Sequence, residues 1–248
     1  MNSVYSSFSK YYDALMCDVD YKARCEYLYS LFCHFDKPPH LLLDLACGTG
    51  NISNEFAHKG VSVIGADMSE EMLSVAQEKS SKLGTDVMYV CQSAENLDLY
   101  GTVDGAVCCL DGLNHITDYS VLCEVFVKVS LFLEKNALFI FDMNTVYKHE
   151  KVLADNTFVV DNGDVYCVWQ NLYSPSERIT DITLDFFSKN GDKYVRSTDS
   201  FSERAYSIEE IKKACEKAGL KVEAVFGDMT EKAPKEDEER IIIVARKI

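Results

Sequence analysis

The stretch LLLDLACGTGN, residues 41–51, predicts a strand, a glycine turn and the start of a helix. Its strand part is apolar except for Asp44, as expected for a strand that is covered on both faces. Gly48 and Gly50 allow a tight turn and a close approach of the backbone to a ligand. Asn51 opens a helical pattern whose N-terminal amides would point at whatever occupies the turn. This order predicts a cofactor cleft at the carboxyl end of a strand in an open α/β sheet.

The spacing of small residues in the turn indicates which cofactor it binds. A dinucleotide fingerprint, G-x-G-x-x-G, needs a third glycine where this chain has Ser53. The pattern present is acid-x-small-x-G-x-G, formed by Asp44, Ala46, Gly48 and Gly50. It resembles motif I of the class I S-adenosylmethionine-dependent methyltransferases, with Ala46 in place of the first glycine. An ordinary strand–helix turn and a variant dinucleotide site are the alternatives for this segment.

Strand and helix patterns alternate along the first 150 residues and return after residue 204. Apolar runs predict further strands at 61–66, 86–91, 103–110 and 137–143, and later at 220–226 and 240–247. Helical spacing lies between them, with Ser69 as an N-cap and Ser207 with Glu210 as a capping box. This alternation is typical of a doubly wound α/β sheet, here with seven strands. The last two strands are expected to pair antiparallel.

A block of a different kind interrupts the alternation after the fifth strand. Residues 157–203 are rich in Val, Tyr, Phe, Thr and Ile and contain two Asn-Gly turn dipeptides, at 162–163 and 190–191. We therefore expect an antiparallel β insertion of about four strands. The domain prediction is a cofactor-binding domain over 1–150 and 204–248, with a β-rich lid over 151–203.

Composition excludes several classes of partner. The net charge of −15 disfavours nucleic acid and anionic membrane surfaces. Ten cysteines without a C-x-x-C pair indicate buried free thiols in a reducing compartment, and no metal site is expected. The N-terminal MNSVYSSFSK lacks the apolar core of a signal peptide, and no apolar run approaches the roughly 20 residues that span a bilayer. A cytoplasmic protein is expected.

Residues that follow the strands are candidates for holding the cofactor. Asp67 follows the second strand, 17 residues after Gly50, where a carboxylate can accept both hydroxyls of a ribose. A helix-flanking acid is the alternative. The resemblance to methyltransferases implies that the loop after the third strand supplies contacts to adenine, and it extends the cofactor site to Asn51 and to the residues Met68, Gln92, Ser93, Ala94 and Leu110.

Other residues are candidates for the acceptor side. Asp111 and His115 follow the fourth strand, and His115 could take a proton because its ordinary pKa lies near neutrality. Tyr12 belongs to the segment FSKYYDALM, which resembles a cofactor-covering segment of one methyltransferase subgroup and would bring Tyr12 near the sulfonium. Trp169, the only tryptophan, and Arg204 are candidate acceptor contacts in the insertion. The alternatives are a satisfied loop histidine for His115 and a cover helix for the segment with Tyr12. For Trp169 the alternative is packing, and for Arg204 it is a surface ion pair.

The resemblance extends over nearly the whole chain. The pattern is similar to bacterial methyltransferases of undefined substrate and to amino-sugar N,N-dimethyltransferases, through the segments FSKYYDALM, DLACGTGN, GADMSEEML, CQSAENL, CCLDGLNHI, FIFDMN and ERAYSIEEI. It implies methyl transfer from S-adenosylmethionine to a nitrogen or oxygen of a small-molecule acceptor, by a monomer or homodimer. A nicotinamide-dependent oxidoreductase and a non-catalytic S-adenosylmethionine-binding protein are the alternatives. Two positions depart from the subgroup: Arg24, where it often has Trp, and Phe201, where it often has His.

Overall fold

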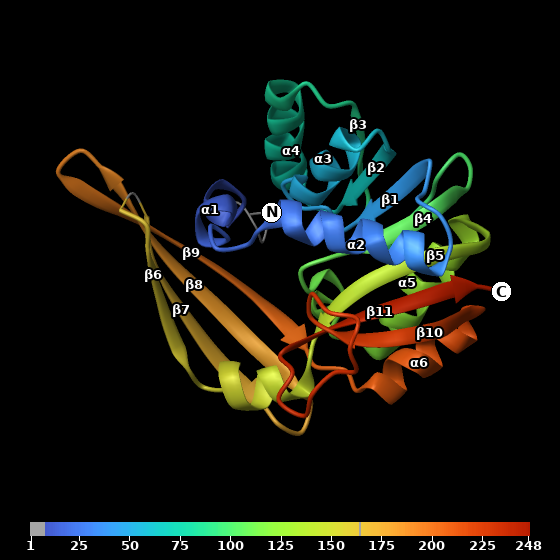
Figure 1. Ribbon diagram of the computed structural model, residues 1–248. Helices are drawn as coiled ribbons and strands as arrows, with labels where there is room; N and C mark the ends of the chain where they lie inside the picture. Colours follow the sequence, from blue (N-terminus) through green and yellow to red (C-terminus); the bar gives the residue numbers. More distant parts are fainter. Residues whose placement is uncertain (1–7, 164) are drawn as a thin grey trace.

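The computed structural model describes residues 8–163 and 165–248, which form two β-sheets connected by helices (Figure 1). The larger sheet has seven strands in the order β10-β11-β5-β4-β1-β2-β3. Strands β1 to β5 are parallel to their neighbours, whereas β11 runs antiparallel to both β5 and β10. The smaller sheet has four antiparallel strands in the order β6-β7-β8-β9. The predicted doubly wound sheet and its β insertion are confirmed.

The elements follow one another as the alternating patterns predict. The strands of the large sheet are β1 (Leu41–Leu45), β2 (Ser62–Asp67), β3 (Val87–Cys91), β4 (Val103–Cys108), β5 (Leu133–Asn144), β10 (Leu220–Gly227) and β11 (Arg240–Lys247). The helices are α1 (Phe8–Leu15), α2 (Tyr21–Phe35), α3 (Asn51–His58), α4 (Glu70–Leu83), α5 (Tyr119–Phe132) and α6 (Ile208–Lys217). Short helical turns are η1 (Ala94–Asn96), η2 (Gly112–His115) and the π-helix η3 (Lys148–Leu153). None of these helices is long and apolar enough to cross a bilayer.

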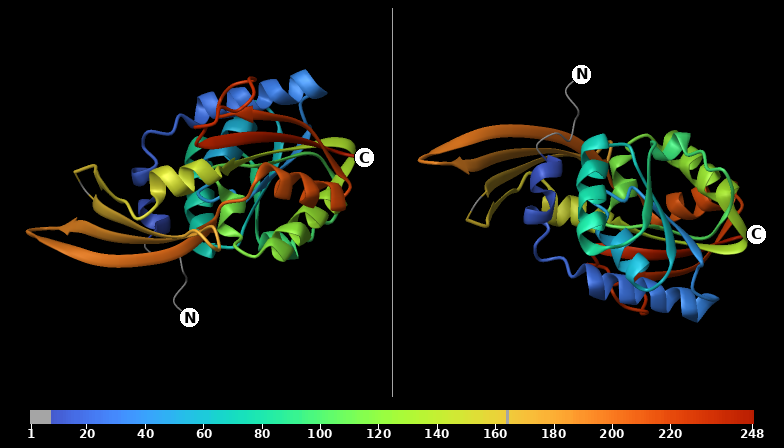
Figure 2. Two further views of the ribbon diagram at one scale, coloured as in Figure 1. Left: turned by 90° about the horizontal axis from the view of Figure 1, so that it is seen from below. Right: turned by 90° about the horizontal axis from the view of Figure 1, so that it is seen from above.

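Two apolar layers hold the large sheet between its helices, as the views in Figure 2 show. Phe126 and Phe139 belong to the layer that α5 and α6 form on one face of the sheet. Phe32 and Phe56 belong to the layer of α2 and α3 on the other face. Because both faces are covered, the central strands are apolar throughout rather than alternating. The parallel strands then present their carboxyl ends together at one edge.

The helix boundaries follow the predicted capping residues. Ser69 accepts a hydrogen bond from the backbone N–H of Met72, and Ser207 forms the predicted capping box with Glu210. The boundaries of the strands differ from the prediction by more than one residue in two places. Strand β4 ends at Cys108, two residues early. Strand β5 begins at Leu133, where α5 ends, four residues earlier than predicted.

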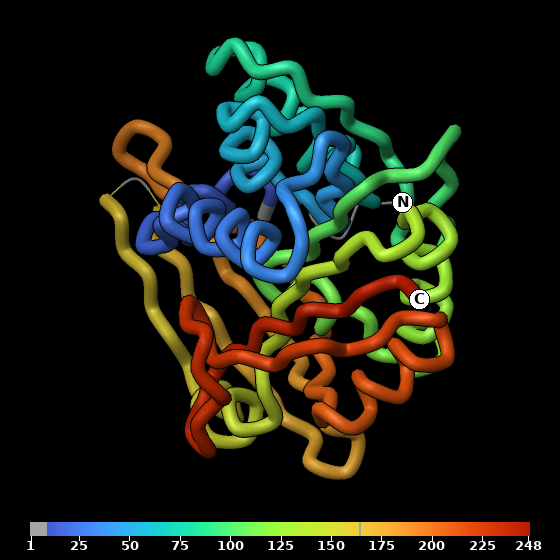
Figure 3. The backbone as a smooth tube through the Cα atoms, turned by 45° about the vertical axis from the view of Figure 1, so that its right-hand side comes forward, coloured from blue at the N-terminus to red at the C-terminus, as the bar shows by residue number. Residues whose placement is uncertain are grey.

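The insertion is a long curved sheet that projects from the large sheet (Figure 1). Its strands are β6 (Thr157–Asp161), β7 (Val165–Ser174), β8 (Ile179–Asn190) and β9 (Lys193–Arg204). Asn162–Gly163 lies between β6 and β7, and Asn190–Gly191 lies at the turn between β8 and β9, as predicted. One face of this sheet packs a small apolar cluster that includes Tyr11 and Leu15 of α1. Helix α1 therefore lies between the two sheets, which Figure 3 also shows. Residues 1–7 of the stretch MNSVYSSFSK lie outside the described residues.

Both ends of the insertion are fixed to the loop after β4. Asn114 is fully buried, and its side-chain amide donates to the carbonyl of Arg204 at 2.9 Å. The backbone N–H of Asn144 donates to Asn114 Oδ1 at 2.9 Å. Tyr206 donates its hydroxyl to the carbonyl of Ile116. The insertion therefore leaves and rejoins the large sheet directly beside the loop that carries His115.

Candidate active site

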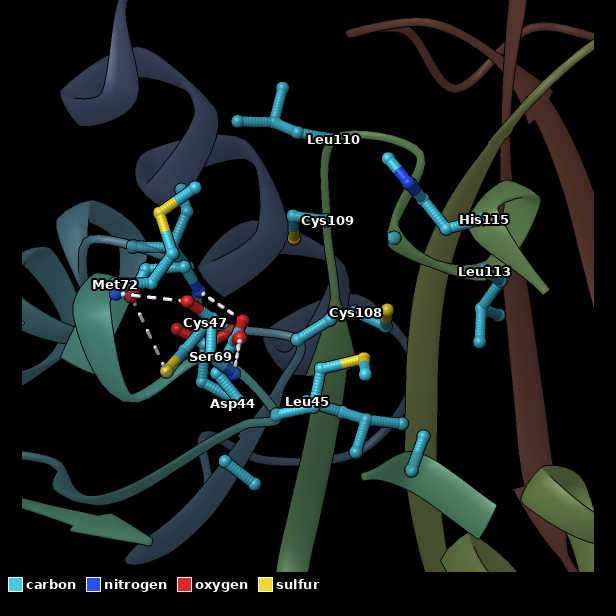
Figure 4. Close-up of a pocket in the computed structure, with 18 of the residues that line it drawn as sticks. Asp44, Leu45, Cys47, Ser69, Met72, Cys108, Cys109, Leu110, Leu113 and His115 are labelled. Carbon is cyan, nitrogen blue, oxygen red and sulfur yellow. Dashed lines mark hydrogen bonds between the residues drawn. The ribbon is translucent and has the colours of Figure 1, made fainter. Parts of the chain in front are cut away.

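A cavity opens at the carboxyl ends of β1, β2 and β4 (Figure 4). Its wall comes from the turns after these strands, from helix α1 and from the loop after β3. It brings together most of the residues predicted to bind the cofactor or to act in catalysis: Tyr12, Asp44, Ala46, Gly48, Asn51, Asp67, Met68, Gln92, Ala94, Leu110 and His115. Segments that are more than 100 residues apart in the sequence therefore meet in one place.

The turn after β1 adopts a conformation that favours glycine. Ala46, Gly48 and Gly50 all have positive φ angles, of 55°, 53° and 74°. A Cβ at Gly50 would also lie 2.3 Å from the hydroxyl of Tyr89, so a larger residue would collide with a buried ring. Gly50 directly precedes α3, and the first N–H groups of that helix therefore face the cavity side of the turn. The turn can hold an anionic or polar group of a ligand through backbone N–H groups.

Two carboxylates accept hydrogen bonds in and around the turn after β1. Asp44 is buried, and its carboxylate accepts a hydrogen bond from Ser53 Oγ at 2.5 Å. Asp67 accepts the N–H of Gly48 at 2.8 Å and the N–H of Ser69 at 2.9 Å. Burial raises the pKa of Asp44 to about 7 and also raises the pKa of Asp67. Asp67 therefore joins the end of β2 to the glycine turn, at the place where ribose binding was predicted.

Helix α1 is fixed over the turn by a network of polar side chains. Asp13 accepts hydrogen bonds from Thr49 Oγ1 at 2.8 Å and from Asn51 Nδ2 at 2.9 Å. Lys79 of α4 forms an ion pair with Asp13 at 2.7 Å and donates to Asn51 Oδ1 at 2.5 Å. This network brings Tyr12 into the wall of the cavity. Burial raises the pKa of the Tyr12 phenol well above its ordinary value, so it remains a neutral hydroxyl at pH 7.

The loop after β3 forms the far wall of the cavity. Gln92 closes this loop on itself, because its side chain exchanges two hydrogen bonds with the backbone of Asp98, at 2.9 and 3.1 Å. Ala94 lies beside it in η1, and the largely exposed Met68 approaches from the turn after β2. Ser93 accepts a hydrogen bond from Asn96 and does not line the cavity. The adenine contacts predicted for this loop remain predictions.

The turn after β4 is held by an ion-pair network from distant parts of the chain. Leu110 and Asp111 have positive φ angles of 58° and 59°, and both donate their N–H groups at 2.7 Å to the carboxylate of Asp142. Arg240 of β11 bridges Asp142 at 2.5 Å and Asp111 at 2.7 Å. Arg24 of α2 lies 3.7 Å from Asp142 and pairs with a further aspartate, Asp228. The turn is therefore strained but well supported.

Four titratable side chains meet where this turn faces the insertion: Asp111, His115, His149 and Glu203, here called the Glu203 cluster. His115 lines the cavity and stacks on the ring of Phe201 at 4.9 Å between ring centroids. Its Nε2 lies 3.8 Å from Glu203 Oε1, and His149 Nε2 lies 3.8 Å from Glu203 Oε2. One ligand atom from each of Asp111, His115 and Glu203 lies within 4.8 Å of the others.

The pKa values of this cluster are shifted in opposite directions. Burial, together with the charge of Asp111, raises the pKa of Glu203 to about 8. Burial lowers the pKa of His115, and it lowers that of His149 to about 4. Burial also opposes the ionisation of Asp111, but the charges of Arg240 and Lys148 outweigh it and hold the pKa of Asp111 below its usual range. Asp111 is thus the one permanent anion of the cluster near neutral pH.

Three thiols also line the cavity. Cys47 belongs to the glycine turn, and Cys108 and Cys109 stand at the end of β4 (Figure 4). Burial raises the pKa of all three well above that of a free cysteine. They therefore remain protonated and act as small apolar side chains.

Some predicted residues lie outside the cavity wall: Gly50, Ser93, Asp111, Trp169 and Arg204. Trp169 donates its indole N–H to Asn171 Oδ1 at 2.6 Å and packs with the apolar cluster of the insertion, on the side that faces α1. Arg204 donates to the carbonyl of Thr117 at 3.0 Å and covers the ring of Tyr206. An acceptor contact by either residue remains a prediction.

The structure also adds residues that the sequence did not single out for the site: Lys79, Asp142, His149, Glu203 and Arg240. Each reaches the site from an element far along the chain from the residue it contacts. Asp142 lies in the segment FIFDMN, and Glu203 is the first residue of the segment ERAYSIEEI. An acidic residue inside an apolar strand was the available signal for Asp142, because buried charges are rare unless they are paired. Glu203 and Lys79 carried no local signal.

Known proteins resemble this chain over almost its full length. A family model described as a methyltransferase domain matches residues 42–130. The chain is 30% identical over 245 residues to Putative methyltransferase YqeM of Bacillus subtilis (strain 168), covering 98% of this chain and 97% of that protein. An S-adenosylmethionine-dependent methyltransferase from Clostridium acetobutylicum ATCC 824 matches with a TM-score of 0.87 and 32% identity, covering 98% of each chain.

A more distant likeness concerns the fold alone. CalS10, an amino pentose methyltransferase from Micromonospora echinaspora whose structure contains S-adenosylmethionine, matches with a TM-score of 0.78 at 17% identity, over 96% of each chain. The insertion and the large sheet are therefore both part of a shared architecture. Because the likeness to the Bacillus and Clostridium proteins covers the insertion as well as the cofactor half, the chain belongs to the class I S-adenosylmethionine-dependent methyltransferases, and its cofactor is S-adenosylmethionine.

Proposed function

We propose that this methyltransferase transfers the methyl group to a nitrogen or oxygen atom of a small molecule that enters between the large sheet and the insertion. The observation that carries the proposal is the position of His115. It lines the cofactor cavity and also stacks on Phe201 of β9, so the inner face of the insertion meets the cavity at this residue. With the family established, the nicotinamide-dependent alternative is set aside.

In this proposal the cofactor occupies the cavity as the residue types suggest. The glycine turn holds the amino-acid end, Asp67 accepts the ribose hydroxyls, and Gln92 and Ala94 contact the adenine. Met68 and Leu110 cover the two ends of the cofactor. Similar solved structures named as methyltransferases of an amino pentose and as a sugar N-methyltransferase support a small polar acceptor, although their likeness to this chain concerns the fold.

The chemistry asks little of the protein beyond positioning. The sulfonium is already activated, so the enzyme has to hold the acceptor atom in line at roughly 3 Å from the methyl carbon and to exclude water. Helix α1 supplies the cover, with Tyr12 at the cavity, and the inner face of the insertion supplies the acceptor side. Trp169 lies on that face and Arg204 at its end, which is why both remain candidate acceptor contacts.

The test is methyl transfer from labelled S-adenosylmethionine to fractions of a bacterial extract, separated into small molecules and macromolecules. We expect label in the small-molecule fraction. Asp67→Ala should weaken cofactor binding about tenfold to a hundredfold, because it removes charge-assisted hydrogen bonds. Asp104→Ala is the matched control, since Asp104 also accepts backbone N–H groups, from His40 and Leu41, at the opposite end of β1. Label confined to protein or nucleic acid, or unchanged affinity in Asp67→Ala, would contradict the proposal.

A further inference from the structure

The Glu203 cluster contains more titratable side chains than a methyl transfer that depends only on positioning requires. Glu203 sits between two histidines, with one carboxylate oxygen 3.8 Å from His115 and the other 3.8 Å from His149. Both separations are too long for hydrogen bonds. Glu203 is 4% exposed, and its carboxylate accepts a hydrogen bond from Asn144 Nδ2 at 3.2 Å. A buried carboxylate of this kind is costly unless a further group satisfies it.

His149 provides a second, independent sign of a missing partner. It is fully buried, and its Nδ1 lies 2.7 Å from Thr180 Oγ1. Its Nε2 has no hydrogen-bond partner among the described residues, although it faces Glu203. When Nδ1–H donates to Thr180, Nε2 carries a lone pair toward a carboxylate, so a proton or a cation is needed between them.

The charges that face Glu203 leave it without a cation of its own. Arg240 is bound to Asp111 and Asp142 together, and Lys148 donates to Asn144 Oδ1 at 3.0 Å rather than to Glu203. Arg24, Arg240 and Lys148 therefore face three aspartates, Asp111, Asp142 and Asp228, and none of these cations forms an ion pair with Glu203. An ionised Glu203 adds one uncompensated negative charge, and both histidines are neutral because burial lowers their pKa values. The cluster can accept one further positive charge.

Zinc and an ammonium group require different spacings of the side chains that bind them. Zinc ligands at about 2.0–2.2 Å from the metal lie roughly 3.3–3.6 Å apart in a tetrahedral site. Acceptors around an ammonium nitrogen, at about 2.7–2.9 Å, lie roughly 4.4–4.7 Å apart. His115 and Glu203 are 3.8 Å apart, and 4.8 Å is the limit for the trio with Asp111. The 3.8 Å pair lies between the two ranges, so spacing does not decide between the two cations. The single uncompensated charge of an ionised Glu203 matches a monovalent ammonium group better than a divalent zinc ion.

We propose that Asp111, His115 and Glu203 bind the ammonium group of an amine acceptor and that Glu203 removes its proton. This proposal rests on the proposed function and names its substrate class. An N–H proton passes from R–NH₃⁺ to Glu203 Oε1, and the electron pair left on nitrogen forms the bond to the methyl carbon. The C–S bond breaks with its electrons going to sulfur, which leaves S-adenosylhomocysteine and R–NH₂⁺–CH₃.

The probes are analogues of S-adenosylhomocysteine in which nitrogen replaces sulfur and carries an aminoalkyl chain of two, three or four carbons. The controls carry a hydroxyl at the end of the same chain. In calorimetry with the full-length protein, we expect the best amine analogue to bind about tenfold to a hundredfold more tightly than its hydroxyl partner. Because Glu203 has a pKa of about 8, binding at pH 7 should also release close to one proton, seen by comparing buffers of different ionisation enthalpy.

Glu203→Gln should remove both the amine preference and the proton release while leaving the affinity for S-adenosylhomocysteine unchanged. Glu231→Gln is the matched control, because Glu231 contacts His34 at 2.6 Å on the exposed surface, and it should behave as wild type. Asp111→Asn, which should reduce the amine preference, serves if Glu203→Gln does not fold.

Equal binding of the amine and hydroxyl analogues to wild type would overturn the ammonium site while the proposed function stands. If the wild-type protein does not bind S-adenosylhomocysteine at all, the result would instead count against the proposed function. Zinc alone is the third probe. One zinc ion per chain, bound by wild type but not by Glu203→Gln and competing with the amine analogue, would overturn the proposal in favour of a metal centre.

Discussion

Single buried carboxyl groups set how the stability of this protein depends on pH. Burial raises the pKa of Asp44 to about 7, against 3.8 for an ordinary aspartate. Between these values the folded protein holds the proton more tightly than the unfolded chain does. The free energy of unfolding contributed by this group therefore falls as pH rises from about 4 to about 7, and is level above that.

Asp44→Asn should remove this dependence. We expect the variant to be more stable than wild type above pH 7, by up to about 4 kcal/mol, with the difference shrinking as pH falls toward 4. Urea unfolding without cofactor, at intervals from pH 4.5 to 8.5, measures it. Asp104→Asn is the control for losing a carboxylate at the other end of β1. A constant difference between Asp44→Asn and wild type across the range would show that Asp44 is not protonated in the folded state.

At the level of single residues, the sequence identifies the parts of the site that are local. Asp44 and Asp67 lie near the carboxyl ends of strands that an apolar run predicts, and Gly48 follows the first of these strands. Their convergence at one edge of the sheet therefore follows from the fold. Glu203 could not be found in this way, because its environment depends on the register of β8 against β9, which places Thr180 directly opposite it. No local pattern fixes that register.

Among the elements, helix α1 covers part of the cavity, because its residue Tyr12 lies in the cavity wall. It contacts α4 through the ion pair between Asp13 and Lys79, and the insertion through Tyr11 and Leu15. In the proposed arrangement the cofactor lies below this helix, and we expect it to leave when the network opens. The rate of cofactor release should therefore depend on Lys79, although Lys79 does not line the cavity.

Lys79→Met should speed the dissociation of S-adenosylhomocysteine about twofold to tenfold, because a partly exposed ion pair contributes on the order of 1 kcal/mol or less. Stopped-flow fluorescence of Trp169, the only tryptophan, can follow dissociation, since it shares an apolar cluster with α1. Lys82→Met removes the exposed ion pair with Glu78 on the same helix and should leave the rate unchanged. Equal rates in Lys79→Met and wild type would mean that α1 does not gate release.

The elements themselves were largely predictable, and the exception has a physical cause. Strand β5 begins four residues before its predicted start. Glu134, Lys135 and Asn136, which follow its first residue, are polar and exposed at this end of the strand. These residues interrupt the apolar run on which the prediction depends. Asn136 also has a positive φ of 68°, so the chain bends before the buried part of the strand begins. Periodicity detects burial, and an exposed strand end carries no such signal.

For the whole molecule, the net charge of −15 makes folding sensitive to salt. Salt screens the repulsion between the negative charges of the folded protein. The free energy of unfolding should therefore rise between about 0.05 and 0.5 M NaCl. Removing two exposed charges by Glu236→Gln with Asp237→Asn should raise the stability at low salt by roughly a few tenths of a kcal/mol and reduce the salt dependence. Lys212→Gln should do the reverse. Urea titrations at both salt concentrations measure this, and a wild-type stability that falls with salt would refute it.

The thiols around the cavity bear on a hazard that every enzyme with an alkylating cofactor faces. A thiolate is a stronger nucleophile toward an activated methyl group than most acceptors, and Cys47, Cys108 and Cys109 all line the cavity in which we propose that the sulfonium donor binds. Their burial keeps them as thiols, because it raises their pKa values well above neutrality. The same apolar packing that builds the end of β4 thus protects the protein from methylating itself.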